Sequence, residues 1–357
     1  MKKLLALLGI ITIAGSGISG IVGNATASEI KSKINYSQTN NLENLNRVQR
    51  NICNNSYIEK FTNIESNIRN IAVDSKGNIY FSKSDSNDVN YNIYVLKQGE
   101  TTETKIMGIP NTNINSIVVD NNDNIYIATG LLYNFDGNVY ILKEDETTAT
   151  KINGINEKRV TSIIINNNDI YFGTSSGHIY VLKNGTTVPE QINFKQIFTN
   201  SDDVNTLAIN KKGDIYFGIY QNGGNNNGVY VLKQGANEVQ KFTQIDRRDI
   251  NAIVVDNNDN MYFGTDYFTY LLKSNTEFTK IYRIQGNRNI LIDNKNNVYF
   301  VNYNNIYLLS KNKIKSLTPT VRKIDTLEGI DIWNSFIDKI TNKIYFATSK
   351  GPYIFEK

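Results

Sequence analysis

Apolar and polar positions alternate in a block that recurs along most of the chain. Each block contains an apolar run that ends at Asp or Asn, a few turn-forming residues, and an Ile-Tyr-Phe-like run that ends in small residues. Two β-rich runs joined by a short polar turn predict a β-hairpin. The blocks cover residues 70–84, 116–130, 162–176, 206–220, 252–266, 289–303 and 335–349.

Two further apolar runs extend each hairpin. The third run is at 92–97, 138–143, 178–183, 228–233, 268–273, 305–310 and 351–356. A fourth run is at 105–109, 151–155, 241–245, 280–284 and 323–327, with an irregular copy at 191–198. Four strands in every repeat of about 45 residues is the spacing of a β-propeller blade.

The seventh copy of the fourth run stands at the front of the chain. "EKFTNIES" (59–66) precedes the first block and nearly matches "QKFTQIDR" (240–247), whereas the chain ends directly after the third run of the last block. We therefore expect "KFTNI" (60–64) to be the outer strand of the last blade. This pairing closes the ring and leaves no exposed strand edge at the seam. The sequence predicts an all-β, seven-bladed β-propeller over 57–357.

The blocks resemble the repeats of two-component-regulator and NHL-like propellers. "VVDNNDNIYIATG" (118–130) has their apolar run, Asp, polar turn, aromatic residue and small ending, with Tyr where many such repeats have Trp. The resemblance implies a seven-bladed propeller and leaves the activity open, because such propellers include binding modules, extracellular sensor domains and a few enzymes.

The N-terminus has the pattern of an export signal. Lys2 and Lys3 precede an apolar segment at 4–15, and "ATA" at 25–27 places small residues at a cleavage site. We expect a signal peptide over 1–27, a polar, disordered spacer over 28–56, and a secreted or cell-surface protein. The alternative is an uncleaved membrane anchor over 4–23, which would be the only membrane contact.

Composition narrows the possible chemistry. The 38 Lys+Arg against 34 Asp+Glu give a net charge of +4, which provides no broad basic surface, so we expect no nucleic-acid partner. The lone Cys53 excludes an intrachain disulfide. The lone His178 is expected to flank a turn. Streptogramin lyases are propellers with an active-site histidine, but no matching cluster is found. We expect no metal, no cofactor and no identifiable catalytic residue.

The Asp-rich turns allow two interpretations. Asp120, Asp123, Asp256 and Asp259 are carboxylates of the kind that bind calcium, but no calcium-binding loop motif surrounds them. The pattern favours turns in which Asp side chains bond their own backbone.

The candidate ligand site lies in the connections that vary between blades. Loops from second to third strands, and from one blade to the next, should share one face of the ring. Aromatic rings and arginines gathered at a concave mouth suit a ligand. The alternative is that Trp333 fills the ring core and the arginines are solvated. The candidates are Tyr133, Phe135, Tyr220, Tyr267, Tyr303, Arg159, Arg247, Arg248, Arg288 and Trp333.

These observations favour a binding module for a protein, glycan or small ligand at the channel mouth, and an enzyme less. One alternative is a propeller hydrolase or lyase in which Asp202, Asp203, Asp249 and Asp331 act with a bound metal. Another is a structural scaffold of the cell envelope.

Overall fold

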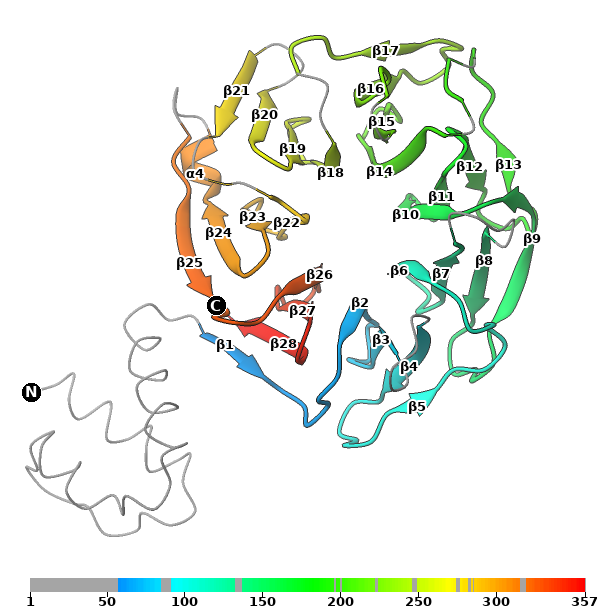
Figure 1. The fold of residues 1–357 in the computed structure, drawn as a ribbon, viewed down its shortest axis with the longest axis vertical. Helices are drawn as coiled ribbons and strands as arrows, with labels where there is room; N and C mark the ends of the chain where they lie inside the picture. Colours follow the sequence, from blue (N-terminus) through cyan, green and yellow to red (C-terminus); the bar gives the residue numbers. More distant parts are fainter. Residues whose placement is uncertain are drawn as a thin grey trace, which may run out of the picture. The chain divides into compact units, whose positions relative to one another are not determined.

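The computed structural model describes residues 57–356 except 85–90, 132–136, 196, 200, 222–223, 246–248, 274–276, 282–283, 285 and 315–318. The described residues form seven four-stranded antiparallel sheets around a central axis (Figure 1). This confirms the seven-bladed, all-β prediction. The expected signal peptide, the spacer and Cys53 lie outside the described residues.

In blades one to six the strands run from the axis outwards in chain order, whereas the outermost strand of blade seven is the first strand of the chain. We number the blades one to seven. The innermost strands are β2 (Ile68–Val73), β6 (Ile114–Val119), β10 (Val160–Asn166), β14 (Asp203–Ile209), β18 (Ile250–Val255), β22 (Asn289–Ile292) and β26 (Ile332–Ile337). The second strands are β3 (Ile79–Lys83), β7 (Ile125–Thr129), β11 (Asp169–Thr174), β15 (Ile215–Tyr220), β19 (Met261–Thr265), β23 (Val298–Val301) and β27 (Ile344–Thr348).

The two outer positions complete the sheets. The third strands are β4 (Asn92–Leu96), β8 (Gly137–Leu142), β12 (Ile179–Leu182), β16 (Gly228–Leu232), β20 (Thr269–Lys273), β24 (Asn305–Leu309) and β28 (Gly351–Glu356). The outer strands are β5 (Thr104–Lys105), β9 (Thr150–Glu157), β13 (Glu190–Gln191), β17 (Val239–Lys241), β21 (Glu277–Ile281), β25 (Arg322–Thr326) and β1 (Tyr57–Lys60). In the described part of the chain, one short helix, α4 (Lys311–Ile314), precedes β25. No helix among the described residues has the length and apolar character needed to cross a membrane.

The two ends of the propeller chain meet in blade seven. Strand β1 pairs antiparallel with β28, from Tyr57 opposite Glu356 to Lys60 opposite Tyr353. The ring is thus closed by the N-terminal strand, as predicted.

The outer strand of blade seven lies a few residues earlier than expected. Strand β1 ends at Lys60, where the predicted run begins. The apolar residues of that run serve the connection: the Phe61 ring packs edge-to-face on Tyr345 at 5.7 Å, and Ile64 is buried with Ile68 between blades seven and one. The apolar run therefore marks the path to the next blade, where it covers the core.

The hydrophobic core lies between neighbouring blades. Each of seven buried clusters joins two adjacent sheets. Successive strand residues face opposite sides of a sheet. In β19, accordingly, Tyr262 packs towards blade six and Phe263 towards blade four. The repeated Tyr-Phe pair therefore supplies one large ring to each of two interfaces.

Most innermost strands carry an irregularity near their start. The register shifts there in blades one to five and in blade seven. A bulge inserts an unpaired residue and can re-aim its side chain. We call the residue five places before the Asp or Asn that ends the apolar run the bulge position. It is occupied in blades one to seven by Arg69, Asn115, Thr161, Asn205, Asn251, Arg288 and Trp333.

Candidate ligand-binding site

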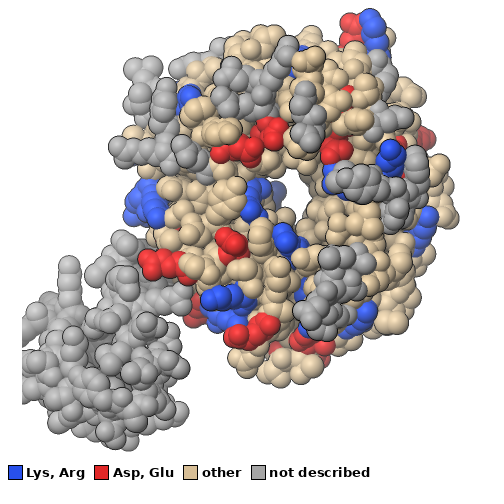
Figure 2. All heavy atoms as spheres, viewed as in Figure 1, with Lys and Arg blue, Asp and Glu red and all other residues tan. Residues whose placement is uncertain are grey.

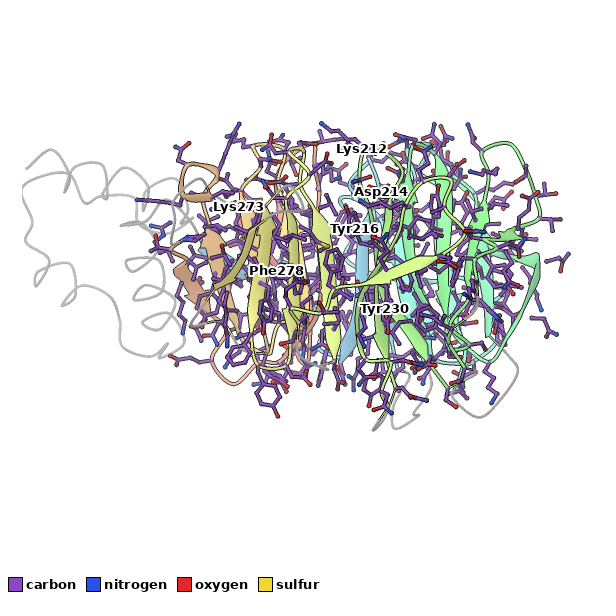
Figure 3. The ribbon with its side chains drawn as sticks, turned by 90° about the horizontal axis from the view of Figure 1, so that it is seen from above. Lys212, Asp214, Tyr216, Tyr230, Lys273 and Phe278 are labelled. Carbon is purple, nitrogen blue, oxygen red and sulfur yellow. The ribbon has the colours of Figure 1, made fainter. Side chains whose placement is uncertain are left out.

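The ring has two chemically different ends. The turns between first and second strands lie at one, which we call the turn end. The loops from second to third strands and the connections between blades lie at the other, the loop end. Figure 3 shows Lys212 and Asp214 of one turn near one edge of the ring and Tyr230 nearer the other edge.

The turn end repeats one hydrogen-bond pattern. In blade five the Asp256 carboxylate accepts the backbone N–H of Asn260 (2.9 Å), the Asn260 side-chain amide (2.8 Å) and the Tyr262 hydroxyl (3.2 Å). Blades one, two and six repeat these three contacts, centred on Asp74, Asp120 and Asp293. These bonds confirm the turn interpretation of the Asp-rich segments.

Backbone conformation agrees with this pattern. Gly77 and Gly213 have φ of 82° and 84°, and Asp123 and Asp259 take the same left-handed region at 59° and 60°. Gly, Asn and Asp adopt this conformation most readily. No group of three or more His, Cys, Asp or Glu side chains placed to hold a metal ion occurs among the described residues.

A channel of about 880 Å³ runs along the axis and is lined by the first strands of all seven blades. In three consecutive blades the bulge position ties one blade to the next. The Asn115 amide donates to the Val160 carbonyl at 2.9 Å, and the Thr161 hydroxyl donates to the Val204 carbonyl at 2.6 Å. The Asn205 amide donates to the Ile250 carbonyl at 3.1 Å. Small polar side chains at this position therefore stabilise the ring.

Blade five departs from this pattern, because its Asn251 amide donates to the Asp266 carboxylate of the same blade at 2.8 Å. Blades six, seven and one also depart from it. Their bulge positions hold Arg288, Trp333 and Arg69 instead. The Arg288 guanidinium carbon lies 4.4 Å from the Trp333 ring centre, and that of Arg69 lies 3.9 Å from it. Because blades six and one flank blade seven, the indole stands between two cations.

Two tyrosines extend the arrangement on both sides. Arg288 also lies 4.4 Å from the ring centre of Tyr303, which is 51% exposed. Arg69 lies 5.8 Å from the ring centre of Tyr91, and its Nε donates to the Tyr91 hydroxyl at 2.9 Å. We call this five-membered array of Tyr303, Arg288, Trp333, Arg69 and Tyr91 the rim stack. Figure 2 shows Lys and Arg side chains at the mouth of the channel on the side of these blades.

The charges of the rim stack are not balanced by nearby acids. No ion pair joins Arg69 or Arg288 to a carboxylate among the described residues. The buried Trp333 Nε1 also has no hydrogen-bond partner there. Like charges held close together, and a buried donor without an acceptor, both cost free energy. An anion bound to the two guanidinium groups would reduce the repulsion between them.

An acidic pair adjoins the Tyr303 side of the rim stack. The backbone N–H of Gly286 donates to the Asp266 carbonyl at 2.7 Å, and Gly286 lies against the Tyr303 ring. Burial, and then the charge of Asp266, raise the pKa of the neighbouring Asp249 carboxyl. Figure 2 shows Asp and Glu side chains over blade five, beside the cationic side of the mouth.

The structure brings together only part of the predicted site. Trp333 and Arg288 are in direct contact, with Tyr303 beside them. Arg159 lies elsewhere, in an ion pair with Asp203 across blades three and four. Tyr220, at the end of β15, and the exposed Tyr267 are at the loop end of blades four and five. Tyr133, Phe135, Arg247 and Arg248 lie outside the described residues.

Sequence reasoning missed Arg69 and Tyr91. Arg69 is inside a strand and precedes the block at 70–84. Tyr91 lies at the end of the long connection 82–92, just before β4, but it was not chosen among the aromatic candidates. A signal was present: when the seven first strands are aligned on their terminal Asp or Asn, Arg69 occupies the same position as Arg288 and Trp333.

His178 flanks the turn at 175–177, as expected, and its backbone carbonyl accepts the Thr174 N–H at 3.1 Å. Its side chain has a further partner. Its Nδ1 lies 2.7 Å from a carboxylate oxygen of the buried Glu157, which also accepts the Tyr180 hydroxyl at 3.0 Å. Burial, and then the Glu157 charge, raise the pKa of Tyr180. The histidine is therefore held between blades two and three, away from the rim stack.

Three of the four carboxylates proposed for a hydrolase have a local structural partner. Asp202 accepts the Thr199 backbone N–H and hydroxyl, Asp203 pairs with Arg159, and Asp249 accepts the Asn227 amide. Asp331 is exposed, and its backbone N–H donates to the Ser349 hydroxyl while its backbone carbonyl accepts the Ser349 N–H.

Comparison with known proteins supports the fold. A family model described as "Two component regulator propeller" matches residues 108–130. No curated protein sequence matches significantly. Among solved structures, virginiamycin B lyase from Staphylococcus aureus with quinupristin is 12% identical, with a TM-score of 0.63, covering 85% of this chain and 99% of the lyase chain.

Two other propellers are similarly distant. The extracellular domain of the hybrid two component system BT3049 from B. thetaiotaomicron is 18% identical, with a TM-score of 0.62, covering 84% of this chain and 41% of that one. YCF48 bound to D1 peptide is 10% identical, with a TM-score of 0.60, covering 85% and 96%. Identities this low show a shared fold alone. The chain is a seven-bladed β-propeller that carries a repeat of the two-component-regulator type.

Proposed function

We propose that this propeller is the binding module of an exported protein and that its ligand occupies the rim stack at the loop end of the channel. The carrying observation is that two guanidinium groups are fixed between three aromatic rings without a carboxylate partner among the described residues. Arginine and aromatic side chains with fixed geometry are the residues that most often dominate binding energy.

The contrast between blades supports a binding role over a structural one. At the same strand position Asn115, Thr161 and Asn205 join neighbouring blades by hydrogen bonds. Blades six, seven and one hold a cluster with two like charges at this position, and in blades six and one the next residue, Asn289 or Asn70, donates its amide to a carbonyl of the following blade instead. Sites shaped for function commonly hold like charges together at some cost in stability.

The comparisons and the N-terminus support the same proposal. One similar propeller is recorded with a bound peptide, and another is an extracellular domain of a signalling system. The predicted signal peptide over 1–27 would place this propeller outside the cell, where a surface ligand can reach the channel mouth.

The single tryptophan makes the site directly observable. Trp333 is the only tryptophan in the chain, so selectively excited tryptophan fluorescence reports on the rim stack. The full-length protein should be screened on peptide and glycan arrays, and each hit titrated by this signal. We expect Arg288→Ala and Arg69→Ala each to lower the affinity for a true ligand by about tenfold.

Asn205→Ala is the matched control, because it alters the bulge position of blade four and leaves the rim stack intact. Circular dichroism should show that all variants remain folded. Hits whose affinity is the same in the wild type and in both arginine variants would overturn the proposal.

A further inference from the structure

The exposed chemistry of the rim stack is that of guanidinium edges. Arg288 has an aromatic ring within 4.4 Å on two sides, Tyr303 and Trp333. Arg69 lies over the Trp333 ring, and its Nε is held by the Tyr91 hydroxyl, which leaves its two terminal nitrogens for a ligand. Stacking covers the faces of a guanidinium group and leaves its N–H fork at the edge. Such forks match the two oxygens of a carboxylate. The stack therefore selects an oxyanion.

The same geometry disfavours a neutral sugar. Sugar rings usually stack on an open indole face, but the Trp333 indole has Arg69 at 3.9 Å and Arg288 at 4.4 Å from its centre. The indole here orients the two arginines and is not an open platform. Recognition must then come from charge and from hydrogen bonds.

The acidic pair beside the stack restricts the choice of anion. Asp266 is joined through its carbonyl to Gly286, which lies against Tyr303, and Asp249 is its neighbour. Two neighbouring carboxyl groups repel a chain of uniform negative charge and attract a cation. A ligand that carries both signs satisfies the two regions together.

We propose that the rim stack binds an acidic side chain of an extended peptide whose neighbouring basic side chain lies over Asp249 and Asp266. This inference rests on the proposed function and specifies its ligand. Of the polymers that could reach the channel mouth, a peptide of mixed charge meets both the cationic and the acidic region. A polyanionic glycan meets only the first.

The test uses the full-length protein and four synthetic probes. They are short peptides of alternating Glu and Lys, the same peptides with Gln in place of Glu, peptides of Glu without Lys, and oligogalacturonate. Trp333 fluorescence should respond most strongly to the Glu/Lys peptide. We expect the Gln peptide and the Glu-only peptide each to bind about tenfold more weakly.

Variants separate the two regions of the site. Arg288→Lys keeps the charge but loses the fork, and should weaken the Glu/Lys peptide by about tenfold. Asp266→Asn should weaken the Glu/Lys peptide and leave the Glu-only peptide unchanged or improved. Asn205→Ala should alter neither. Raised salt should weaken binding in the wild type, because the contacts are ionic.

The outcomes distinguish this inference from the proposed function. If the Gln peptide binds as well as the Glu/Lys peptide, or oligogalacturonate binds more tightly, and Arg288→Ala still abolishes binding, the stack is a ligand site but the acidic-peptide assignment is wrong. If no probe changes Trp333 fluorescence while array hits do so in an Arg288-dependent manner, the assignment is again wrong. If binding of every probe and every array hit is independent of Arg69 and Arg288, both proposals fail.

Discussion

The turn end and the loop end of this ring are built on opposite principles. At the turn end, four blades use the same Asp, Asn and Tyr in the same three hydrogen bonds, and blade four uses the same positions with the roles of Asn210 and Asp214 exchanged. At the loop end, the equivalent bulge positions differ, and three consecutive blades hold Arg288, Trp333 and Arg69.

The difference shows where repetition is needed for folding and where it is not. A turn that fails to form would disrupt a hairpin, so each blade needs its own version. The mouth of the channel is already held by the sheets behind it and can change its chemistry. Breaks in the repeat are therefore better indicators of function than the repeat itself.

Removing the central Asp256 of the blade-five turn should have the largest effect on stability. Asp256 is 4% exposed and accepts bonds from Asn258, Asn260 and Tyr262. Asp256→Ala should lower the free energy of unfolding by about 3 kcal/mol, because several buried donors lose their acceptor. Chemical denaturation measures this loss.

A paired exchange sharpens the same test. Asp256→Asn alone sets two amide donors against each other, whereas Asp256→Asn with Asn260→Asp recreates the Asn210/Asp214 pair of blade four. The double variant should regain most of the stability lost by Asp256→Asn. If it is no more stable than the single variant, the turn end is not governed by this bond pattern.

Removing one tie between blades should cost less. The Asn115 amide donates to the carbonyls of Val160 at 2.9 Å and Gly130 at 3.2 Å. Asn115→Ala should therefore lower the free energy of unfolding by about 1 kcal/mol. Urea denaturation of this variant beside Arg288→Ala compares the same position in two blades. If Arg288→Ala lowers the free energy of unfolding as much as Asn115→Ala or more, the two positions do not differ in structural importance, and the contrast between an inter-blade tie and a ligand site fails.

Replacing Arg288 by Asn, the residue at the bulge positions of blades two and four, should leave the free energy of unfolding nearly unchanged. Arg288→Asn loses ring contacts with Tyr303 and Trp333 but also relieves repulsion with Arg69, so the net change should be within about 1 kcal/mol. Ligand affinity should fall by about tenfold in the same variant. Thermal unfolding and the Trp333 titration measure the two quantities. A variant that unfolds readily would show that the stack is structural.

The fold was predicted from the sequence more completely than the proposed site. Seven tyrosines about 45 residues apart, and a spare outer-strand motif at the front, were enough for the blade number and the closing strand. They misplaced β1 by a few residues because its apolar run covers the core instead of forming the strand. The periodicity of apolar residues shows which residues are buried. It does not show whether a buried residue belongs to a strand or to a connection that covers the core.

The proposed site was predicted only in part, for a related reason. Trp333, Arg288 and Tyr303 break the repeat near loops, and the structure joins them. Arg69 was not among the candidates, because strand alternation gives no sign of the bulge that changes the side-chain direction. Arg159 was predicted for the site but pairs with Asp203 in another blade.

The smallest predicted effect concerns the acidic pair beside the rim stack. Burial and the Asp266 charge raise the pKa of Asp249 above its usual value of 3.8. At a pH between the unfolded and the folded pKa, the Asp249 carboxyl therefore keeps its proton in the folded protein and has released it in the unfolded chain. Stability should accordingly fall as pH rises through the interval between the unfolded and folded pKa values.

Asp249→Asn removes this proton equilibrium and the repulsion from Asp266. Its melting temperature should exceed that of the wild type slightly near neutral pH, and the difference should shrink as the pH is lowered towards about 4. Thermal unfolding of both proteins across this range tests the sign. A variant that loses stability at neutral pH would mean that the Asn227 bond to Asp249 outweighs the repulsion. The acidic side of the mouth would then contribute to folding, as the turn end does. Only the cationic side of the mouth would differ from the turn end in this respect.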